Sequence, residues 1–277
     1  MRVSVINQLS LVLVFFGVNA ACAQNKTDYD SERIEDNSFL IEEAYNQDPG
    51  VIQHISTFQY MNDRTWTYTF TDEWPVGGMK HQLSTTIPVM NAGFAGFGDV
   101  ELNYRYQAVY TSRLAFSPRF SLVLPTGNYK KGFGNGAVGY QISLPMSFIT
   151  SRKLVTHYNL GATFTPGAKA ADQTTSDIRT VNYGASAILL VSPTFNFMLE
   201  AAGNTTNVKM DGVSTSGGNF LLINPGFRYA INFKSGLQIV PGISVPIGLD
   251  AAKDRVRVFA YLSFEHPLKR ISRIKTN

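Results

Sequence analysis

The chain has 277 residues, of which 44% are hydrophobic, 12% aromatic and 16% charged, and its formal net charge is +4. This length is sufficient for one large domain, and the abundance of Phe and Tyr is more typical of an all-β protein than of a helical one. The basic residues form no face interleaved with aromatic residues, so nucleic acid is excluded as a partner.

Residues 1–23 are typical of a secretory signal peptide. Arg2 supplies the positive start, and the apolar stretch LSLVLVFFGV is too short for a comfortable transmembrane helix. The tripeptide Ala-Cys-Ala at 21–23 is a small-x-small cleavage pattern, which leaves Gln24 as the mature N-terminus. The alternative is a lipoprotein signal with Cys22 acylated, although Asn19 stands where such signals usually carry Leu. With ordinary cleavage the mature chain has no cysteine and therefore no disulfide.

The segment 24–50 precedes the first predicted strand and is acidic. Within it, the stretch SFLIEEAY could form a short helix, with Phe39, Leu40 and Ile41 on its apolar side. The acidic side chains of the segment are Asp28, Asp30, Glu32, Glu35, Asp36, Glu42 and Glu43.

From residue 51 to the C-terminus, the dominant pattern is an alternation of apolar and polar residues with a period of two. This pattern predicts strands rather than helices. Most are about ten to thirteen residues long, more than the usual soluble strand and close to the roughly 9–11 residues that a tilted membrane strand requires. The twelve predicted strands lie near 51–61, 65–74, 79–89, 99–110, 113–125, 137–149, 152–165, 179–191, 194–205, 219–231, 235–247 and 255–266.

The connections between these strands alternate in length. Tight turns near 111–113, 150–152, 192–194 and 232–235 are separated by longer polar loops. Short periplasmic turns and longer outer loops are typical of an outer-membrane β-barrel, and an even strand count places both termini in the periplasm. Closed barrels also satisfy every backbone polar group in lipid. We therefore predict a transmembrane antiparallel barrel over residues 51–277, with a soluble β-sandwich or propeller as the alternative.

Prolines interrupt the strand pattern in several places. Because proline removes a donor from the hydrogen-bond ladder, some strands are expected to be bulged or shorter than the pattern alone suggests. The prolines concerned are Pro118, Pro145, Pro225, Pro241 and Pro246.

The face opposite the apolar one is rich in Ser, Thr, Asn, Gly, Gln and Arg, which suits a wet lumen. Its charges either create a transverse field that selects solutes, or pair with one another across a packed lumen, because buried charges are usually paired. The predicted lumen-lining charges are Asp99, Glu101, Arg105, Arg113, Arg119, Glu200, Arg228 and Arg257.

The position of the acidic segment beside the predicted barrel mouth leaves two hypotheses open. Since the lumen would carry more Arg than acid, the segment could fold into it by charge pairing and narrow the path as a plug. Alternatively it is a mobile periplasmic tail, as chain termini often are.

Gly134, Gly136 and Gly139 spell the G-x-G-x-x-G pattern of dinucleotide-binding turns. Such a site requires a strand, the glycine turn and then a helix. Here the residues after Gly139, YQISLPMSF, alternate with period two and predict a strand. We therefore expect no cofactor, and we assign these glycines to the turn chemistry of a long outer loop.

The stretch 118–148 also resembles the signature of an outer-membrane family named for the meta-cleavage pathway of phenol degradation. The matching residues are Pro118, Arg119, Ser121, Leu122, Leu124, Pro125, Thr126, Gly127, Gly139, Gln141, Pro145 and Ser147. SFLIEEAYNQDPGVIQHI, beginning at Ser38, is similar to the N-terminal signature of a bacterial subset of that family. The resemblance implies a barrel, transport of small and perhaps aromatic molecules, and no established catalytic residues.

Three functional classes follow from these patterns. We favour a channel or transporter for small, aromatic or apolar solutes in the outer membrane of a Gram-negative bacterium, without catalytic or metal-binding residues. Its expected partners are outer-membrane lipid, the solute and, during biogenesis, the barrel-assembly machinery. The alternatives are a structural or adhesive barrel and a barrel hydrolase, which would require a histidine in contact with both a hydroxyl and a carboxylate. The histidines are His54, His81, His157 and His266.

Overall fold

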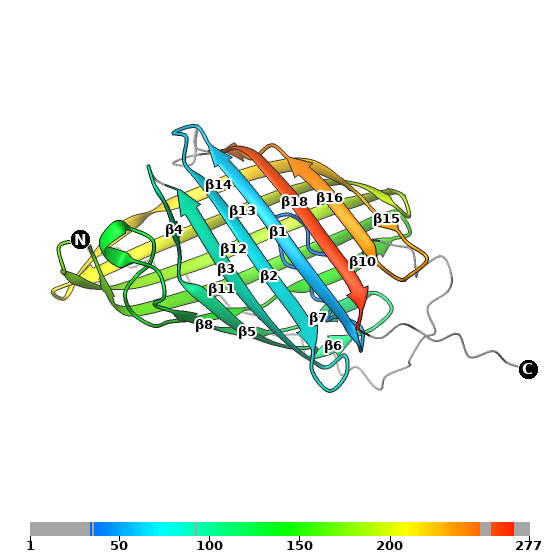
Figure 1. Ribbon diagram of the computed structural model, residues 1–277, viewed down its shortest axis with the longest axis horizontal. Helices are drawn as coiled ribbons and strands as arrows, with labels where there is room; N and C mark the ends of the chain where they lie inside the picture. Colours follow the sequence, from blue (N-terminus) through cyan, green and yellow to red (C-terminus); the bar gives the residue numbers. More distant parts are fainter. Residues whose placement is uncertain (1–33, 35, 92, 250–255, 269–277) are drawn as a thin grey trace, which may run out of the picture.

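The computed structural model of the protein describes residues 34, 36–91, 93–249 and 256–268, and for 256 and 257 it describes the backbone alone. Its strands form one antiparallel sheet, which is closed because β1 (Val51–Met61) pairs with both β2 (Trp66–Pro75) and β18 (Val256–Pro267). The result is a tilted barrel (Figure 1). The predicted signal peptide lies outside the described residues.

Between β2 and β18, several β-segments follow one another along the same line of the sheet and together make one barrel strand. Counted in this way, the sheet has the twelve barrel strands that the alternation predicted. The segments are β3 (His81–Asn91), β4 (Ala95–Phe97), β5 (Val100–Tyr106), β6 (Val109–Tyr110), β7 (Leu114–Phe116), β8 (Arg119–Leu124), β9 (Gly139–Ser143), β10 (Met146–Ser151), β11 (Leu154–Lys169), β12 (Thr175–Ser192), β13 (Phe195–Met210), β14 (Val213–Tyr229), β15 (Ile231–Asn232), β16 (Gln238–Ser244) and β17 (Ile247–Gly248).

Proline explains three of the interruptions. Pro118 separates β7 from β8, Pro145 separates β9 from β10, and Pro246 separates β16 from β17. At each of these points the missing N–H breaks the ladder locally, as expected. Pro225 and Pro241, in contrast, remain inside β14 and β16.

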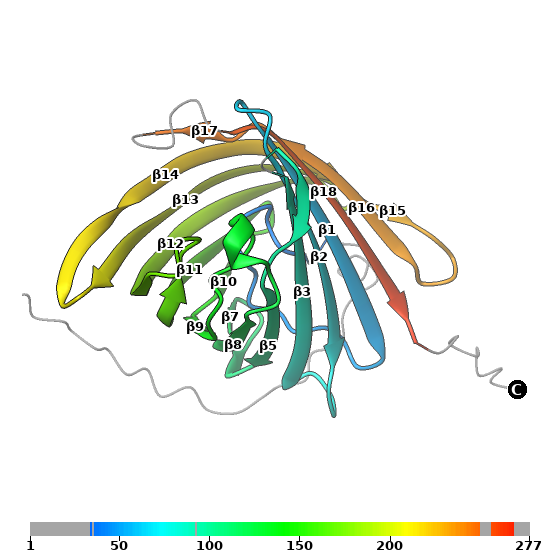
Figure 2. The same ribbon diagram turned by 60° about the vertical axis from the view of Figure 1, so that its left-hand side comes forward.

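The strands β11 to β14 are longer than predicted, with 16, 18, 16 and 17 residues. The sequence pattern assigned their ends to long polar loops, and that assignment is wrong. The connections are short, at 170–174 and 211–212, and β12, β13 and β14 extend beyond their neighbours (Figure 2). These ends are rich in Thr, Ser, Asn and Gly and lack apolar alternation, so period-two reasoning could not detect them.

The two faces of the sheet have the predicted polarity. Tyr104 and Tyr106 point outward and are 40% and 41% exposed, whereas Asn103 and Arg105, which alternate with them, point inward and are buried. An apolar outer surface with a polar interior is the arrangement of a membrane barrel. Among the described residues, no helix is long and apolar enough to cross a membrane.

The loop 125–138 is held against the barrel at the end where β3 and β4 meet, which we call the loop end. Asp99 accepts hydrogen bonds from the backbone N–H of Gly127 (2.9 Å) and Asn135 (2.7 Å), and Phe133 is only 3% exposed. Gly139, the last glycine of the G-x-G-x-x-G pattern, begins the strand β9 and not a helix. The opposite end, which carries the tight turns, is called the turn end below.

Candidate functional site

The interior of the barrel is occupied by the chain's own residues 36–48, called the inner segment from here on. In Figures 1 and 2 it is the blue coil enclosed by the strands. Ser38 and Ala44 are completely buried, and Asp36 and Ile41 are 2% and 3% exposed. The segment contains no helix, so the short helix predicted over SFLIEEAY is wrong. Its backbone groups bond to the barrel wall instead of to one another.

The tip of the inner segment is bound by two side chains of the wall. Glu200 of β13 accepts hydrogen bonds from the backbone N–H of Leu40 (2.9 Å) and Ile41 (3.1 Å). Asn159 of β11 binds both backbone groups of Glu42, accepting from its N–H at 2.7 Å and donating to its carbonyl at 2.8 Å. A buried chain without secondary structure needs such partners, because an unpaired backbone group is costly.

The middle of the segment is bound in the same way. The backbone N–H of Ala44 donates to Ser147 (2.8 Å), and its carbonyl accepts from Ser117 (2.7 Å) and Gln107 (2.9 Å). Arg105 donates to the carbonyl of Tyr45 at 2.6 Å. These side chains come from three different barrel strands, so the hydrogen bonds to the segment depend on the folded sheet.

Glycines on the inner face create the room for the two apolar anchors of the segment. A Cβ on Gly226 or on Gly242 would lie 2.5 Å from the ring of Phe39, and one on Gly184 would lie 2.3 Å from Ile41. The Phe39 ring also packs against Phe259, with 5.6 Å between the ring centroids. Phe39 belongs to an apolar cluster in the barrel interior with Ile55, Val155, Ile188, Met198, Phe259 and Tyr261.

We expect Gly242→Ala to destabilise the protein by about 1–3 kcal/mol, because the new methyl group overpacks the seat of Phe39. The contacts around Gly242 are side-chain atoms of Phe39 and Arg228, so the clash depends on the ring. In Phe39→Ala, the same glycine substitution should cost close to nothing. A double-mutant cycle of unfolding free energies measures this coupling. Additive costs would show that Phe39 does not occupy the seat in solution.

Charge pairing between the segment and the wall is concentrated on Glu42. Its two carboxylate oxygens bind Arg105 (3.2 Å) and Arg119 (3.0 Å). Arg119 in turn donates to Asn103 at 2.7 Å and Ser121 at 2.6 Å, which fixes the guanidinium on the wall. The electrostatic attraction expected from the sequence therefore exists, and Glu42 makes two ion pairs with the wall.

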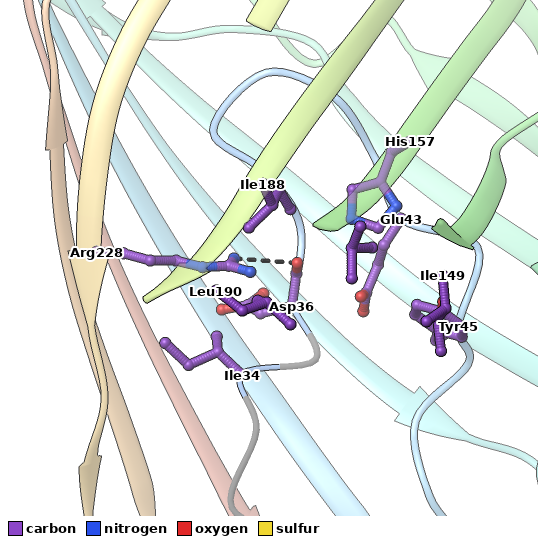
Figure 3. Close-up of a pocket in the computed structure, with 10 residues that line it drawn as sticks. Ile34, Asp36, Glu43, Tyr45, Ile149, His157, Ile188, Leu190 and Arg228 are labelled. Carbon is purple, nitrogen blue, oxygen red and sulfur yellow. Dashed lines mark hydrogen bonds between the residues drawn. The ribbon is translucent and has the colours of Figure 1, made fainter. Parts of the chain in front are cut away.

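Asp36 is held mainly by neutral groups. Its carboxylate accepts hydrogen bonds from the hydroxyls of Tyr261 and Ser263, both at 2.6 Å, and from the amide of Gln53 at 2.8 Å. Arg228 donates instead to the backbone carbonyls of Asp36 (3.0 Å) and Asn37, as Figure 3 shows for Asp36. Hydrogen bonding, more than charge, holds this part of the segment.

A chain of side-chain amides closes the space between the segment and the wall of β1 to β3. The backbone N–H of Gln47 donates to Gln82 (2.7 Å), its side-chain amide donates to Gln53, and Gln82 donates to Glu73 (2.7 Å). On the opposite side, by β10 to β12, the small cavity drawn in Figure 3 has a volume of about 20 Å³, room for about one water molecule.

Above these contacts, two larger cavities flank the tip of the segment. The first has a volume of about 420 Å³, and its lining combines apolar side chains, among them Leu40, Phe220 and Leu222, with amides such as Gln59 and Asn182. We call it the vestibule. The second, of about 180 Å³, lies against β1, β2, β3 and β5. Its lining includes hydroxyls and carboxylates, namely Thr57, Thr71, Thr86, Ser84, Glu73 and Glu101.

The predicted lumen-lining charges fall into different places. Arg105, Glu200 and Arg228 point inward and are at most 2% exposed, in contact with the inner segment. Arg119 lines both larger cavities and Glu101 lines the second. Three predicted residues lie elsewhere or cannot be placed: Asp99 fastens the loop 125–138, Arg113 is exposed in a tight turn, and the side chain of Arg257 lies outside the described residues.

The residues that sequence reasoning did not single out are mostly neutral. Ser147, Asn159, Gln53 and Gln82 bind the segment but carry no charge to draw attention to them. The alternation of inward and outward positions along each strand could have identified them as inward-facing residues. That alternation does not tell which inward amide or hydroxyl will meet the segment.

None of the four histidines, all of which the structure describes, contacts both a hydroxyl and a carboxylate. His157 bonds to Ser147 at 2.7 Å and His81 to Tyr104 at 2.7 Å, while His54 lies 2.9 Å from Asp72 and 3.2 Å from His266. The geometry that a serine hydrolase requires is therefore missing from these contacts.

Comparison with known proteins identifies a protein family and solved structures that are similar to this chain. The family model described as "Putative MetA-pathway of phenol degradation" matches residues 46–248. An outer membrane channel from Pseudomonas putida F1 is similar with a TM-score of 0.63 at 10% identity, over 80% of this chain and 97% of that one. At this identity the likeness shows a shared fold. A comparison with curated proteins gives no match.

Two other solved barrels are less similar in shape. A KdgM porin has a TM-score of 0.47 at 10% identity, covering 79% of this chain and 99% of that one. The toluene transporter TodX of Pseudomonas putida has a TM-score of 0.35 at 9% identity, covering 78% and 86%. All three structures are β-barrels of outer membranes.

Proposed function

Since the chain belongs to the phenol-degradation MetA-pathway family and is an outer-membrane β-barrel of a Gram-negative bacterium, we propose that it is a channel for small solutes. The vestibule is the observation that carries this proposal, because it provides a cavity of about 420 Å³ inside the barrel. The floor of the vestibule is the tip of the inner segment, so a solute must pass or displace that tip to cross the barrel.

The lining of the vestibule supports a particular kind of solute. Phe220 and Leu222 on β14 and Leu40 on the segment offer an apolar surface, and Gln59 and Asn182 offer hydrogen bonds. The rest of the lining is largely polar and includes Glu42, Arg119, Gln141, Asn159 and Asn204. An apolar surface beside groups that form hydrogen bonds is a feature of small-molecule sites. This combination fits a small aromatic or apolar solute with one polar group, the class that the family name also suggests.

The inner segment is, in this proposal, the plug of the channel. It carries Glu42 into the centre of the lumen, where Arg105 and Arg119 pair with it. Two other predicted lumen charges, Glu200 and Arg228, hold the plug by binding its backbone groups. Glu101 faces the second cavity and is the carboxylate best placed to influence a passing solute.

The protein has no catalytic role in this proposal. Ser147 contacts His157, but its hydroxyl also accepts a hydrogen bond from the backbone N–H of Ala44. The inner segment therefore lies where a substrate would have to approach this hydroxyl. The partners we propose are the surrounding lipid, the solute and, during insertion, the barrel-assembly machinery.

Solute flux tests the channel directly. Liposomes that contain the protein should take up a small aromatic alcohol faster than they take up a sugar of similar mass, because the vestibule lining favours the apolar body. Phe220→Asn with Leu222→Asn should reduce that preference several-fold without unfolding the barrel. A folded protein that admits neither solute, with or without its inner segment, would favour the structural-barrel alternative.

A further inference from the structure

The most unusual property of the lumen is that it binds the inner segment largely through the segment's backbone. From Asp36 to Gln47, wall side chains bond to main-chain groups of nearly every residue, apart from Ser38 and Phe39. The side chains that make these bonds are Arg228, Glu200, Asn159, Arg105, Ser147, Gln107, Ser117 and Gln82. Backbone groups are the same in every peptide, so this recognition does not depend on sequence.

Other contacts depend on the side chains of the segment. Phe39 and Ile41 occupy seats formed by glycines, and Glu42 meets two arginines. Asp36, Ser38 and the amides of Asn46 and Gln47 make further side-chain contacts with the wall. Main-chain hydrogen bonds that give affinity, combined with side-chain pockets that give specificity, are a recurrent way in which proteins recognise peptides.

We infer that the lumen is a binding site for linear peptides that enter it as a bent, non-helical loop, of which the inner segment is the intramolecular occupant. The class is defined by a carboxylate at the position of Asp36, an aromatic residue three positions later, an aliphatic residue two positions after that and a second carboxylate next to it, with tolerance elsewhere. This inference goes beyond the proposed solute channel, because it assigns a second kind of ligand to the lumen.

Tethering explains how a peptide site can remain occupied by its own chain. A segment attached by a short linker has an effective concentration of roughly millimolar, so a free peptide must exceed this to compete. The inner segment joins β1 through Pro49 and Gly50, which are exposed in a turn at the turn end. Cutting the chain there removes the tether without touching any of the wall residues that bind the segment.

The experiment uses the complete protein with a protease recognition sequence inserted between Pro49 and Gly50. The protein is folded first, its barrel is verified by a heat-dependent shift in electrophoretic mobility, and it is then cut, so that no variant needs to fold without the segment. The released segment is exchanged against three fluorescent peptides, and binding is followed by anisotropy. Uncut protein is the matched control and should bind none of them at micromolar concentration.

The first peptide has the sequence of residues 36–48. The second keeps only the residues equivalent to Asp36, Phe39, Ile41 and Glu42, with Ala and Ser elsewhere. The third is the second with N-methyl groups at the positions equivalent to 40, 41 and 42, which removes the three N–H groups that donate to Glu200 and Asn159. We expect the first two to bind within about tenfold of each other and the third to bind about a hundredfold more weakly.

Two outcomes would overturn the inference. If the first peptide binds and the second does not, the lumen is a dedicated seat for its own segment. If the third peptide binds as well as the second, the backbone contacts do not carry recognition. The conductance of the cut protein decides the solute channel separately, because it is measured with no peptide present.

Discussion

Deletion of residues 24–46 should raise the conductance of the protein in a planar bilayer several-fold. The described part of this stretch fills the centre of the barrel, with Ser38 and Ala44 fully buried and Phe39 only 6% exposed. Eight-stranded barrels are filled by side chains and barrels of about 16–18 strands hold an aqueous channel, so we expect twelve strands to leave a passage once the inner segment is removed. The measurement is the single-channel current in symmetrical salt.

The control is the folded state of the deletion variant, followed by its β-type circular dichroism and its heat-dependent electrophoretic mobility. Glu42→Gln is the partial version of the same change, because it removes the pairing with Arg105 and Arg119 but leaves the backbone bonds in place. It should raise conductance less than the deletion does. Unchanged conductance in a folded deletion variant would mean that residues 36–48 do not obstruct the path.

Lysine substitutions on the two faces of the wall should differ strongly in cost. Ile142→Lys should destabilise the barrel by about 2–4 kcal/mol if the residue lies near the bilayer midplane, because a charge on the lipid face has no partner and no water. Ile142 is 55% exposed on the outer face. It pairs with Ala162, which pairs on its other side with Val181.

Asn182→Lys is the matched inward substitution, since Asn182 follows Val181 and lines the vestibule at nearly the same height. It should cost less, because the ammonium can reach water in the cavity. Gln141 and Ser121 also point inward, but both bond to Arg119. A lysine at either position would be repelled by that guanidinium, so its cost would not report the position alone. Equal unfolding free energies for Ile142→Lys and Asn182→Lys would contradict the assignment of the two faces.

The sequence alone determined the wall of the barrel. Period-two alternation is a local property, so it predicted the number of strands, their approximate limits and the face on which Tyr104 or Arg105 lies. It underestimated β11 to β14, because beyond the apolar band nothing selects for alternation and Thr, Ser and Asn are compatible with strand and loop alike.

The tertiary structure decided what the barrel contains. Whether residues 36–48 are a plug or a tail depends on groups far apart in the chain, such as Glu200 for Leu40 or Ser263 for Asp36, which only the closed sheet brings together. The charges of the sequence suggested an attraction between the acidic segment and the arginines of the wall. Most of the hydrogen bonds, however, join wall side chains to backbone groups of the segment, and backbone groups cannot be distinguished from one another in a sequence. The sequence does not reveal the seats on Gly226 and Gly242 either, because an inward glycine becomes a seat only when a side chain from a distant part of the chain, here Phe39, packs against it.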